Sequence, residues 1–337
     1  MDLITSMSVT AAALIITALS GFFIIPALRR LKYGQTILDI GPAWHKSKQG
    51  TPTMGGIMFI FGSGAAFTIG LVMLWNGGFI RFEGVGELNF FKAVSGFLMA
   101  LAFAFVGFLD DYIKVRKKRN EGLTANQKII FQIMIISAYF TARVMAGDTS
   151  TVITFPLLGQ LDLWYFYYVI MGLAILYIVN AVNLTDGVDG LCSSVSLVYC
   201  AAFMVICSKL GFIELSLLSV AVAGACLGFL IWNFHPAKVF MGDTGSMFLG
   251  GIVCALGIGA GVEVIMVIAA AVFIWEALTV LIQVSYFKVT GGKRLFKMTP
   301  IHHSFELRGW KEVKIVLLFS ILAAAAGTLA IILTNHL

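Results

Sequence analysis

Apolar residues occur along this chain in long runs, which Gly, Pro and clusters of charge interrupt. A run of about 20 apolar residues is long enough for one α-helix to cross the hydrocarbon core of a membrane. The runs fall at residues 8–28, 52–75, 93–112, 128–146, 163–181, 188–208, 213–233, 246–262, 264–287 and 313–335. The run 264–287 is the least apolar because it contains Glu276 and Gln283, so we expect it to be bent or partly outside the membrane. The pattern predicts an all-α integral membrane protein with about ten transmembrane helices.

The composition agrees with a surface that faces lipid. Hydrophobic residues make up 59% of the chain and charged residues only 12%, whereas an ordinary soluble domain is about 25% charged. Ten helices and their loops use up the 337 residues, so we expect one polytopic domain over 1–337. The first run lacks a basic leader and a cleavage site, which favours a retained helix. The five cysteines all lie in apolar runs without metal-ligand spacing, and we interpret them as buried apolar side chains.

The placement of Lys and Arg predicts the orientation. Basic residues are enriched in the cytoplasmic loops of membrane proteins. One alternating set of loops contains Arg29, Arg30, Lys32, Lys46, Lys48, Lys114, Arg116, Lys117, Lys118, Arg119, Lys128, Lys238, Lys288, Lys293, Arg294, Lys297, Arg308, Lys311 and Lys314. The opposite set contains only Arg81, Lys92, Arg143 and Lys209. We therefore expect the basic loops to be cytoplasmic and, since the number of spans is even, both termini to be extracytoplasmic.

Two adjacent carboxylates, Asp110 and Asp111, end the third run at the predicted cytoplasmic face. Neighbouring residues on a helix point about 100° apart, so one carboxylate can bind a metal while the other faces a substrate. The alternative is an interfacial pair in which Lys114, four residues on, supports Asp110.

The segment 180–191 holds two amides, Asn180 and Asn183, and two acids, Asp186 and Asp189, around two glycines. The acids are three residues apart and would face one site if the turn were helical. Glycines allow a ligand to approach the backbone closely. A turn with an Asp that caps the next helix is the alternative.

The segment 233–246 begins with Asn233 and contains Phe240, followed by Asp243 between two glycines. A carboxylate at this place suits Mg²⁺, which prefers carboxylate and phosphate oxygens, and Phe240 is able to stack on a base. The alternative is that Asp243 caps the next helix, and that role is compatible with the role of a ligand.

Two further runs contribute polar residues to the same side. The run 300–306 contains His302 and His303 among basic residues, which suits phosphate contact or proton transfer; hard oxygen ligands elsewhere argue against zinc. The run 50–56, which includes Thr53 and follows Lys48, has no Walker A spacing. Five polar clusters on one side favour a cytoplasmic site for a nucleotide-linked substrate, Mg²⁺ and phosphoryl transfer.

At these residues the sequence resembles a family, the bacterial phospho-N-acetylmuramoyl-pentapeptide transferases, within the wider polyprenyl-phosphate N-acetylhexosamine-1-phosphate transferases. The Asp110–Asp111 pair and the runs 183–191 and 240–246 resemble signatures of the wider group, and the runs 50–56 and 300–306 resemble the muramoyl-pentapeptide branch. The family carries three consecutive histidines in the last run, where this chain has Ser304 third.

The resemblance implies the reaction of UDP-MurNAc-pentapeptide with undecaprenyl phosphate to give lipid I and UMP, with Mg²⁺, at the bacterial cytoplasmic membrane during peptidoglycan synthesis. It implies that Asp110, Asp111, Asp243 and His302 are catalytic and that Asp243 is the Mg²⁺ ligand. The substrate-binding residues it implies are Lys48, Thr53, Lys114, Lys128, Asn183, Asp186, Gly187, Asp189, Asn233, Phe240, Gln283 and His303. It leaves open a homodimer, the choice of base between Asp110 and Asp111, and direct transfer against a covalent intermediate.

Two other functions compete with this interpretation. A relative in the wider group would transfer GlcNAc-1-phosphate from UDP-GlcNAc, and the runs 50–56 and 300–306 argue against it. A secondary transporter would carry charges near the membrane midplane and often an inverted repeat. Here the acids gather at one face and the sequence shows no such repeat.

Overall fold

The computed structural model describes residues 3–30, 50–78, 85–117 and 121–337. It is predominantly helical, and in these residues ten helices are long and apolar enough to cross a membrane. The ten are α1 (Leu3–Arg30), α2 (Gly56–Asn76), α3 (Val85–Lys117), α4 (Ala125–Met145), α5 (Phe166–Thr185), α6 (Leu191–Lys209), α7 (Ile213–Asn233), α8 (Gly242–Gly259), α10 (Ala271–Val289) and α12 (Glu312–Leu333). The prediction of ten spans in an integral membrane protein is confirmed at this level.

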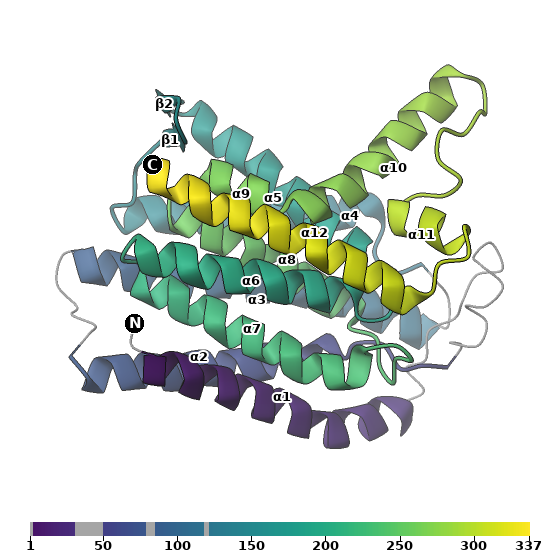
Figure 1. The fold of residues 1–337 in the computed structure, drawn as a ribbon, viewed down its shortest axis with the longest axis horizontal. Helices are drawn as coiled ribbons and strands as arrows, with labels where there is room; N and C mark the ends of the chain where they lie inside the picture. Colours follow the sequence, from purple (N-terminus) through teal and green to yellow (C-terminus); the bar gives the residue numbers. More distant parts are fainter. Residues whose placement is uncertain (1–2, 31–49, 79–84, 118–120) are drawn as a thin grey trace.

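The helices lie roughly along one direction and surround α8 (Figure 1). The most apolar part of α8 is 89% buried, the largest share among the ten spans. Glycines allow this close packing: a Cβ on Gly250 would lie 2.7 Å from Val179 Cα in α5, and one on Gly251 would lie 2.7 Å from Ala100 Cα in α3. The core of the bundle is therefore built around α8, whose first residues carry Asp243.

The ninth apolar run is interrupted, in agreement with the expected bend, but the interruption precedes both of its polar residues, Glu276 and Gln283. It divides at Ala270 into a short helix, α9 (Glu263–Ala269), and α10. Helix α10 slants away from the other helices, and α11 (Ile301–Glu306) lies below its far end (Figure 1). The ninth run thus leaves the bundle on the side where the histidines lie. It is not the least apolar of the spans, because α8 and α4 have lower mean hydropathy, 1.2 and 1.4 against 1.5 for α10.

A two-stranded antiparallel hairpin lies at the opposite end of the bundle and has no counterpart among our predictions. Strand β1 (Val152–Phe155) pairs with β2 (Gly159–Asp162), with Val152 opposite Asp162 and Phe155 opposite Gly159. Both chain termini lie at this hairpin end, the C-terminus after a short 3₁₀ turn, Thr334–His336 (Figure 1). An even number of spans requires both termini to share one end, as the sequence predicted.

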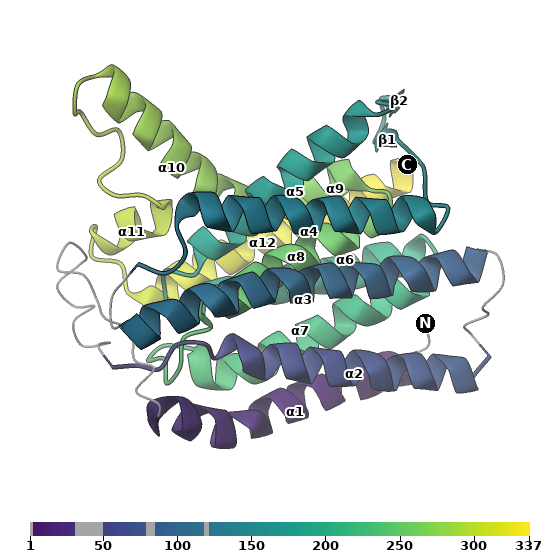
Figure 2. The same ribbon diagram turned by 180° about the vertical axis from the view of Figure 1, so that it is seen from behind.

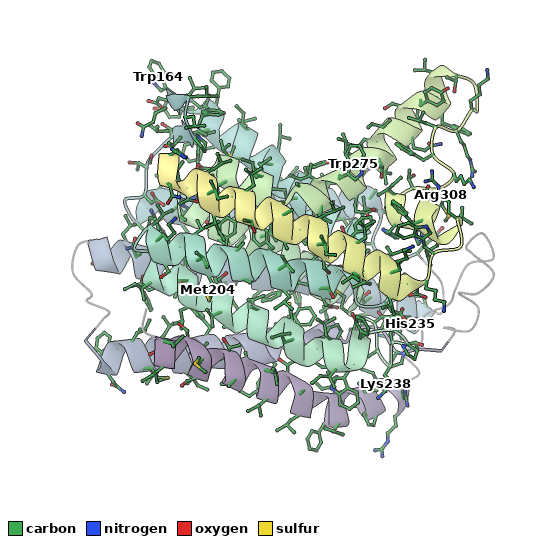
Figure 3. All side chains as sticks on the ribbon, in the orientation of Figure 1. Trp164, Met204, His235, Lys238, Trp275 and Arg308 are labelled. Carbon is green, nitrogen blue, oxygen red and sulfur yellow. The ribbon has the colours of Figure 1, made fainter. Side chains whose placement is uncertain are left out.

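The two ends of the bundle differ in their residues. Seen from behind, α3 and α4 run side by side between the two ends (Figure 2). Trp164 lies at the hairpin end, whereas His235, Lys238 and Arg308 lie at the other, which we call the α11 end (Figure 3). Helices α3, α5 and α7 finish at the α11 end, and α4, α6, α8 and α12 begin there. Most of the predicted site residues that the structure describes come from these helix ends and their connections; Thr53, Gln283, His302 and His303 come from the segment before α2, from α10 and from α11.

Candidate active site

Three carboxylates meet at the α11 end. Asp110 and Asp111 lie on α3, two turns before its last residue, and Asp243 is the second residue of α8. One carboxylate oxygen from each of the three lies within 4.8 Å of the others. Asp110 and Asp111 are buried, with exposed fractions of 0% and 3%. Such a cluster of hard oxygen atoms is suited to a Mg²⁺ ion.

Two lysines join two of these acids. Lys114 Nζ lies 2.6 Å from Asp110 Oδ2 and 3.1 Å from Asp243 Oδ2. Lys128 Nζ lies 2.7 Å from Asp243 Oδ2 and 3.1 Å from Asp110 Oδ1. The pair of Asp110 with Lys114, which we considered as an isolated interfacial contact, is therefore part of a four-residue network. The sequence predicted Lys128 at the start of the fourth apolar run. In the structure it lies in the first turns of α4, which begins at Ala125.

Asp111 has a different environment from Asp110. It accepts hydrogen bonds from the backbone N–H groups of Asp243 (3.2 Å) and Thr244 (2.9 Å) and from the Thr244 hydroxyl (2.7 Å). These donors belong to the first turn of α8, whose N–H groups lack partners within the helix. The proposed capping of α8 by Asp243 is wrong: Asp111, from another helix, accepts these bonds, and the Asp243 side chain turns to the lysines.

Gly242 precedes Asp243 and has a φ of +70°, which favours glycine. A Cβ here would also lie 2.5 Å from Asp111 Oδ2 and 2.7 Å from Thr53 Oγ1. Thr53 belongs to the 50–56 run, and this run pairs its backbone with the segment before α8. Gly55 N–H donates to Phe240 C=O (2.8 Å), and Phe240 N–H donates to Pro52 C=O (2.9 Å). The two motifs thus form one wall of the site.

The last turn of α5 reaches the carboxylate cluster through Asn183. Its amide nitrogen donates to Asp243 Oδ1 (3.0 Å) and to Ser246 Oγ (2.8 Å). Asp186 is half-buried, and burial together with the negative charges of Asp243 and Asp111 raises its pKa to about 8. A neutral Asp186 is able to donate a hydrogen bond to a ligand at neutral pH.

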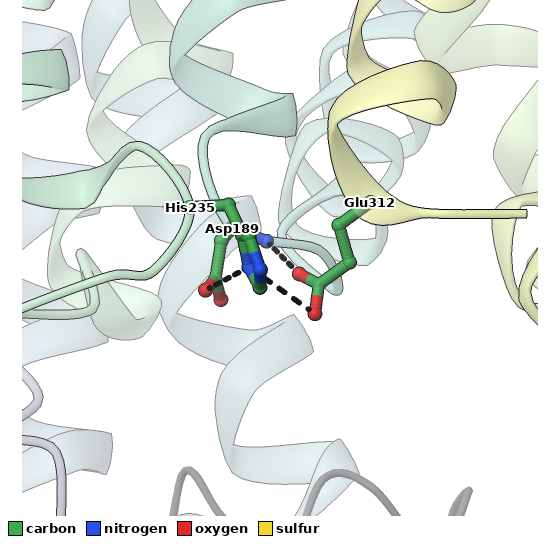
Figure 4. A group of neighbouring side chains, drawn as sticks. All are labelled: Asp189, His235 and Glu312. Carbon is green, nitrogen blue, oxygen red and sulfur yellow. Dashed lines mark hydrogen bonds and ion pairs between the residues drawn. The ribbon is translucent and has the colours of Figure 1, made fainter.

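The second acid of the turn after α5, Asp189, faces other partners. The turn is not helical, and Gly190 has a φ of +79°, so the condition under which we expected both acids to face one site is not met. Asp189 Oδ2 accepts from Ala237 N–H (3.0 Å) and lies 3.2 Å from His235 Nδ1. Glu312 Oε2 accepts the Asp189 backbone N–H at 3.1 Å (Figure 4).

The sequence analysis did not identify Glu312 or a partner role for His235. Figure 4 shows the three side chains converging from the turn, the α7–α8 connection and the start of α12. Glu312 is 123 positions from Asp189 along the chain, and no local spacing marks it. Together they fix Asp189 in place from two other segments.

Of the two predicted histidines, His302 is fully buried. Its Nδ1 lies 3.0 Å from Glu276 Oε2, and both side chains are 0% exposed. A Cβ on Gly187 would overlap His302 Nε2, so this histidine lies directly against the backbone of the turn at Gly187. His303 is partly buried, with Nδ1 2.6 Å from Glu306 Oε2.

Two other predicted residues, Gln283 and Asn233, bind the backbone of loops at this end. Gln283 Oε1 accepts the backbone N–H groups of Leu295 (3.1 Å) and Phe296 (2.8 Å). Asn233 accepts from Ser193 Oγ (3.1 Å) and donates to Val239 C=O (3.0 Å).

Ser304, which occupies the position of the third histidine, donates to Met298 C=O (2.6 Å) and accepts Met298 N–H (3.1 Å). Phe240, whose backbone pairs with the 50–56 run, is half-buried. The predicted residue Lys48 lies outside the described residues.

A bundle of membrane-spanning helices with carboxylates, lysines and histidines gathered at one end is typical of a membrane enzyme that acts on phosphate-containing substrates. Comparison with known proteins agrees with this class: the family described as Glycosyl transferase family 4 matches residues 93–261. The first signature of phospho-N-acetylmuramoyl-pentapeptide-transferase matches residues 48–60.

Relatives that bear this name are similar over nearly their whole length. A phospho-N-acetylmuramoyl-pentapeptide-transferase of Clostridioides difficile is 42% identical, over 98% of this chain and 98% of its own. Those of Bacillus pumilus (45%, over 91% and 90%) and Pelotomaculum thermopropionicum (41%, over 94% and 94%) are similar too. The chain therefore belongs to the phospho-N-acetylmuramoyl-pentapeptide-transferase family.

Proposed function

We propose that this protein transfers phospho-MurNAc-pentapeptide from UDP-MurNAc-pentapeptide to undecaprenyl phosphate, giving lipid I and UMP. The family membership supports the substrates. The observation that carries the chemistry is the meeting of Asp110, Asp111 and Asp243 with Lys114 and Lys128 at one end of the bundle. Two anionic substrates repel each other, and such a site offsets that repulsion.

The donor set fits Mg²⁺. The three carboxylate oxygens lie within 4.8 Å of one another, and carboxylates with phosphate oxygens are the usual magnesium ligands. We infer that Asp243 holds the ion, assisted by Asp110, because Asp111 already accepts three hydrogen bonds from the start of α8. When bound, the ion supplies positive charge against the diphosphate and the departing UMP.

The two lysines have a second task once substrates are present. Each Nζ atom contacts carboxylates from two helices, and an ammonium group has three donors. Lys114 and Lys128 therefore remain able to bind phosphate oxygens while they are held by Asp110 and Asp243. Their positive charge draws the lipid phosphate toward the sugar-linked phosphorus.

Asp110 rather than Asp111 is our choice for the group that positions or deprotonates the lipid phosphate. An oxygen of that phosphate forms a bond to the sugar-linked phosphorus of the donor, and the bond from this phosphorus to the UMP oxygen breaks. Asp111 holds the first turn of α8, so its oxygens are engaged. Within the described part of the chain, Asp110 accepts one backbone N–H, from Leu123 (2.8 Å), and contacts its two lysines.

The surrounding polar residues bind the donor. Asn183, Asp186 and Asp189 line the turn that meets the uridine and its linkage, with Gly187 allowing close approach. Phe240 stacks on the base.

The other predicted residues complete the donor site. Thr53 and His303 contribute from the adjoining segments, and His302 lies near the diphosphate. Lys48 is assigned to the donor on sequence alone, because it begins the matched signature at 48–60. Asn233 and Gln283 act by holding the loops whose backbone they bind.

The protein is placed in the bacterial cytoplasmic membrane, with the α11 end on the cytoplasmic side and both termini outside. The basic residues in the last turns of α3, in the first turns of α4 and in the 288–314 segment support this orientation, because they belong to the α11 end. A nucleotide-linked donor made in the cytoplasm then reaches the site directly.

The test is UMP release by purified protein in detergent with UDP-MurNAc-pentapeptide, a polyprenyl phosphate and Mg²⁺. We expect release that requires the lipid, stops with EDTA and is lost in Asp243→Ala. Asp162→Ala, an exposed acid at the hairpin end, is the matched control and should keep full activity. UMP release with UDP-GlcNAc but not with UDP-MurNAc-pentapeptide would contradict the donor assignment. If neither donor gave UMP, the proposal that the protein is a transferase would be wrong.

A further inference from the structure

A polar cavity lies at the hairpin end, at the other end of the bundle from the carboxylate cluster. Its volume is about 370 Å³, and residues of α3, α4, α5, the hairpin and the α8–α9 connection line it. Cavities of about 300–1,000 Å³ are typical of small-ligand sites. The side chains at its mouth, Ser150 and Gln160, are exposed. The cavity is therefore large enough for a small polar group and borders the surface.

Its inner wall carries two cationic side chains, Lys92 and Arg143, and the carboxylate of Asp148, which contacts both. Arg143 Nε donates to Asp148 Oδ2 at 2.7 Å, and the same oxygen accepts from Arg143 Nη2. Lys92 Nζ lies 3.7 Å from that oxygen. One carboxylate thus faces two positive charges.

The remaining acid of the cavity, Glu263, pairs with a tyrosine. Tyr167 donates its hydroxyl to Glu263 Oε1 at 2.6 Å. Burial raises the pKa of the Glu263 carboxyl, so its neutral form is favoured relative to an exposed glutamate. The wall therefore has a net positive charge when Glu263 is protonated.

Two buried polar atoms of this wall have no partner among the described residues. They are Arg143 Nη1 and Glu263 Oε2. Arg143 is 5% exposed and Glu263 is 3% exposed. An unpaired buried donor or acceptor is costly, and native structures leave few of them. Both residues line the cavity, so a polar ligand there would satisfy both atoms.

We propose that this cavity binds a phosphate group. Phosphate oxygens would accept from Lys92 Nζ and Arg143 Nη1, and the polar residues at the mouth, Ser150, Thr154 and Gln160, would bind the remaining oxygens.

The phosphate belongs either to a soluble phosphate ester or to a phospholipid headgroup. Exposed Leu158, Trp164 and Tyr165, at 86%, 70% and 86%, border the hairpin. Aromatic and apolar residues of this kind sit at membrane interfaces, which gives a headgroup access to the cavity.

The decisive variant is Lys92→Gln, which removes one cation without breaking the Arg143–Asp148 pair. Lys209→Gln is the matched control, because Lys209 is at the same end but does not line the cavity. Lys92→Arg keeps the charge and should keep binding. Loss of a hydrogen bond to a charged group corresponds to about tenfold or more in affinity, so we expect at least that loss in Lys92→Gln only.

Two arms distinguish the sources of phosphate. In the first, glycerol 3-phosphate is titrated calorimetrically into each purified protein, with glycerol as the control ligand. In the second, native mass spectrometry counts the molecules of phosphatidylglycerol retained by each protein, with diacylglycerol as the control.

The site is supported if Lys92→Gln weakens binding in either arm while Lys209→Gln and Lys92→Arg preserve it. The arm in which binding occurs then identifies the source of the phosphate group. Binding that is absent from both arms, or equal in wild type and Lys92→Gln, overturns it. UMP release should be unchanged in Lys92→Gln, so failure of this inference is separable from failure of the proposed transferase.

Discussion

The Nδ1 atom of His302 lies 3.0 Å from Oε2 of Glu276, and neither side chain has any exposed surface. A carboxylate at Nδ1 favours the tautomer with its proton on that nitrogen, which leaves Nε2 as an acceptor. Nε2 has no partner among the described residues and lies against Gly187. Glu276 is therefore a positioning residue for the histidine that we place near the diphosphate.

Glu276→Gln should lower kcat for UMP release by about tenfold to a hundredfold, as the loss of an outer partner of a functional histidine typically does. KM for the donor should change less, because the amide keeps the shape of the side chain. Steady-state kinetics over a range of donor concentrations measure both. Glu214→Gln, another buried glutamate on α7, should behave as wild type. Equal losses in the two variants would show that the effect is only structural.

Gly187→Ala tests the contact on the other side of the same histidine. Its Cβ would overlap His302 Nε2, so the turn or the imidazole must move. A misplaced functional group costs up to about a hundredfold in rate, and we expect a loss of activity with little change in thermal unfolding. Gly172→Ala is the control, since its Cβ would meet Ile136 Cγ2 at an ordinary 3.5 Å. Full activity in Gly187→Ala would contradict a fixed position for His302.

The sequence predicted the helices well because each span is a local feature. Ten runs of about 20 apolar residues correspond to ten long helices. The run 264–287 is interrupted, but at Ala270, and its polar residues Glu276 and Gln283 lie inside the continuous helix α10. The hairpin 152–162 was missed because its strands have only four residues each. Such short strands show little alternation, and pairing rather than pattern defines them.

The candidate site was predicted only in part, because it depends on contacts between residues that are far apart in the sequence. Motifs and the family resemblance identified Asp110, Lys114 and Asp243, which the structure brings together. The roles of Glu276 and Glu312 were missed, because their partners lie 26 and 123 positions away. A buried glutamate in an apolar run is costly unless paired, and that was the one available signal for Glu276. For Glu312 there was none.

Asp111→Ala should destabilise the protein more than Asp110→Ala. Asp111 accepts three hydrogen bonds from the first turn of α8, and each buried donor left without an acceptor costs about 1–3 kcal/mol. In Asp110→Ala both lysines keep Asp243 as a partner, and one backbone donor, Leu123 N–H, loses its acceptor. Thermal unfolding in EDTA compares the two. A larger loss in Asp110→Ala would contradict the assignment of Asp111 as the cap of α8.

Asp186 should make the stability of the metal-free protein depend on pH. Its pKa rises from 3.8 to about 8 on folding, chiefly through burial, so between these values the folded state binds a proton that the unfolded state lacks. Stability from this group is fully present below the unfolded pKa. It falls as pH rises toward about 8 and levels off above that.

The control is Asp186→Asn, whose side-chain amide does not titrate. Other titrating groups affect both proteins equally, so the difference between their melting temperatures at each pH isolates the effect of Asp186. In EDTA, the melting temperature of the wild type should fall relative to Asp186→Asn by about 2 °C or more between roughly pH 5.5 and pH 8. The difference should then stay constant above that range. Thermal unfolding at several pH values measures it, and parallel curves for the two proteins would mean that Asp186 is ionised throughout. A flat difference would also remove the reason to treat Asp186 as a hydrogen-bond donor to the uridine-linked substrate, and would make it an acceptor instead.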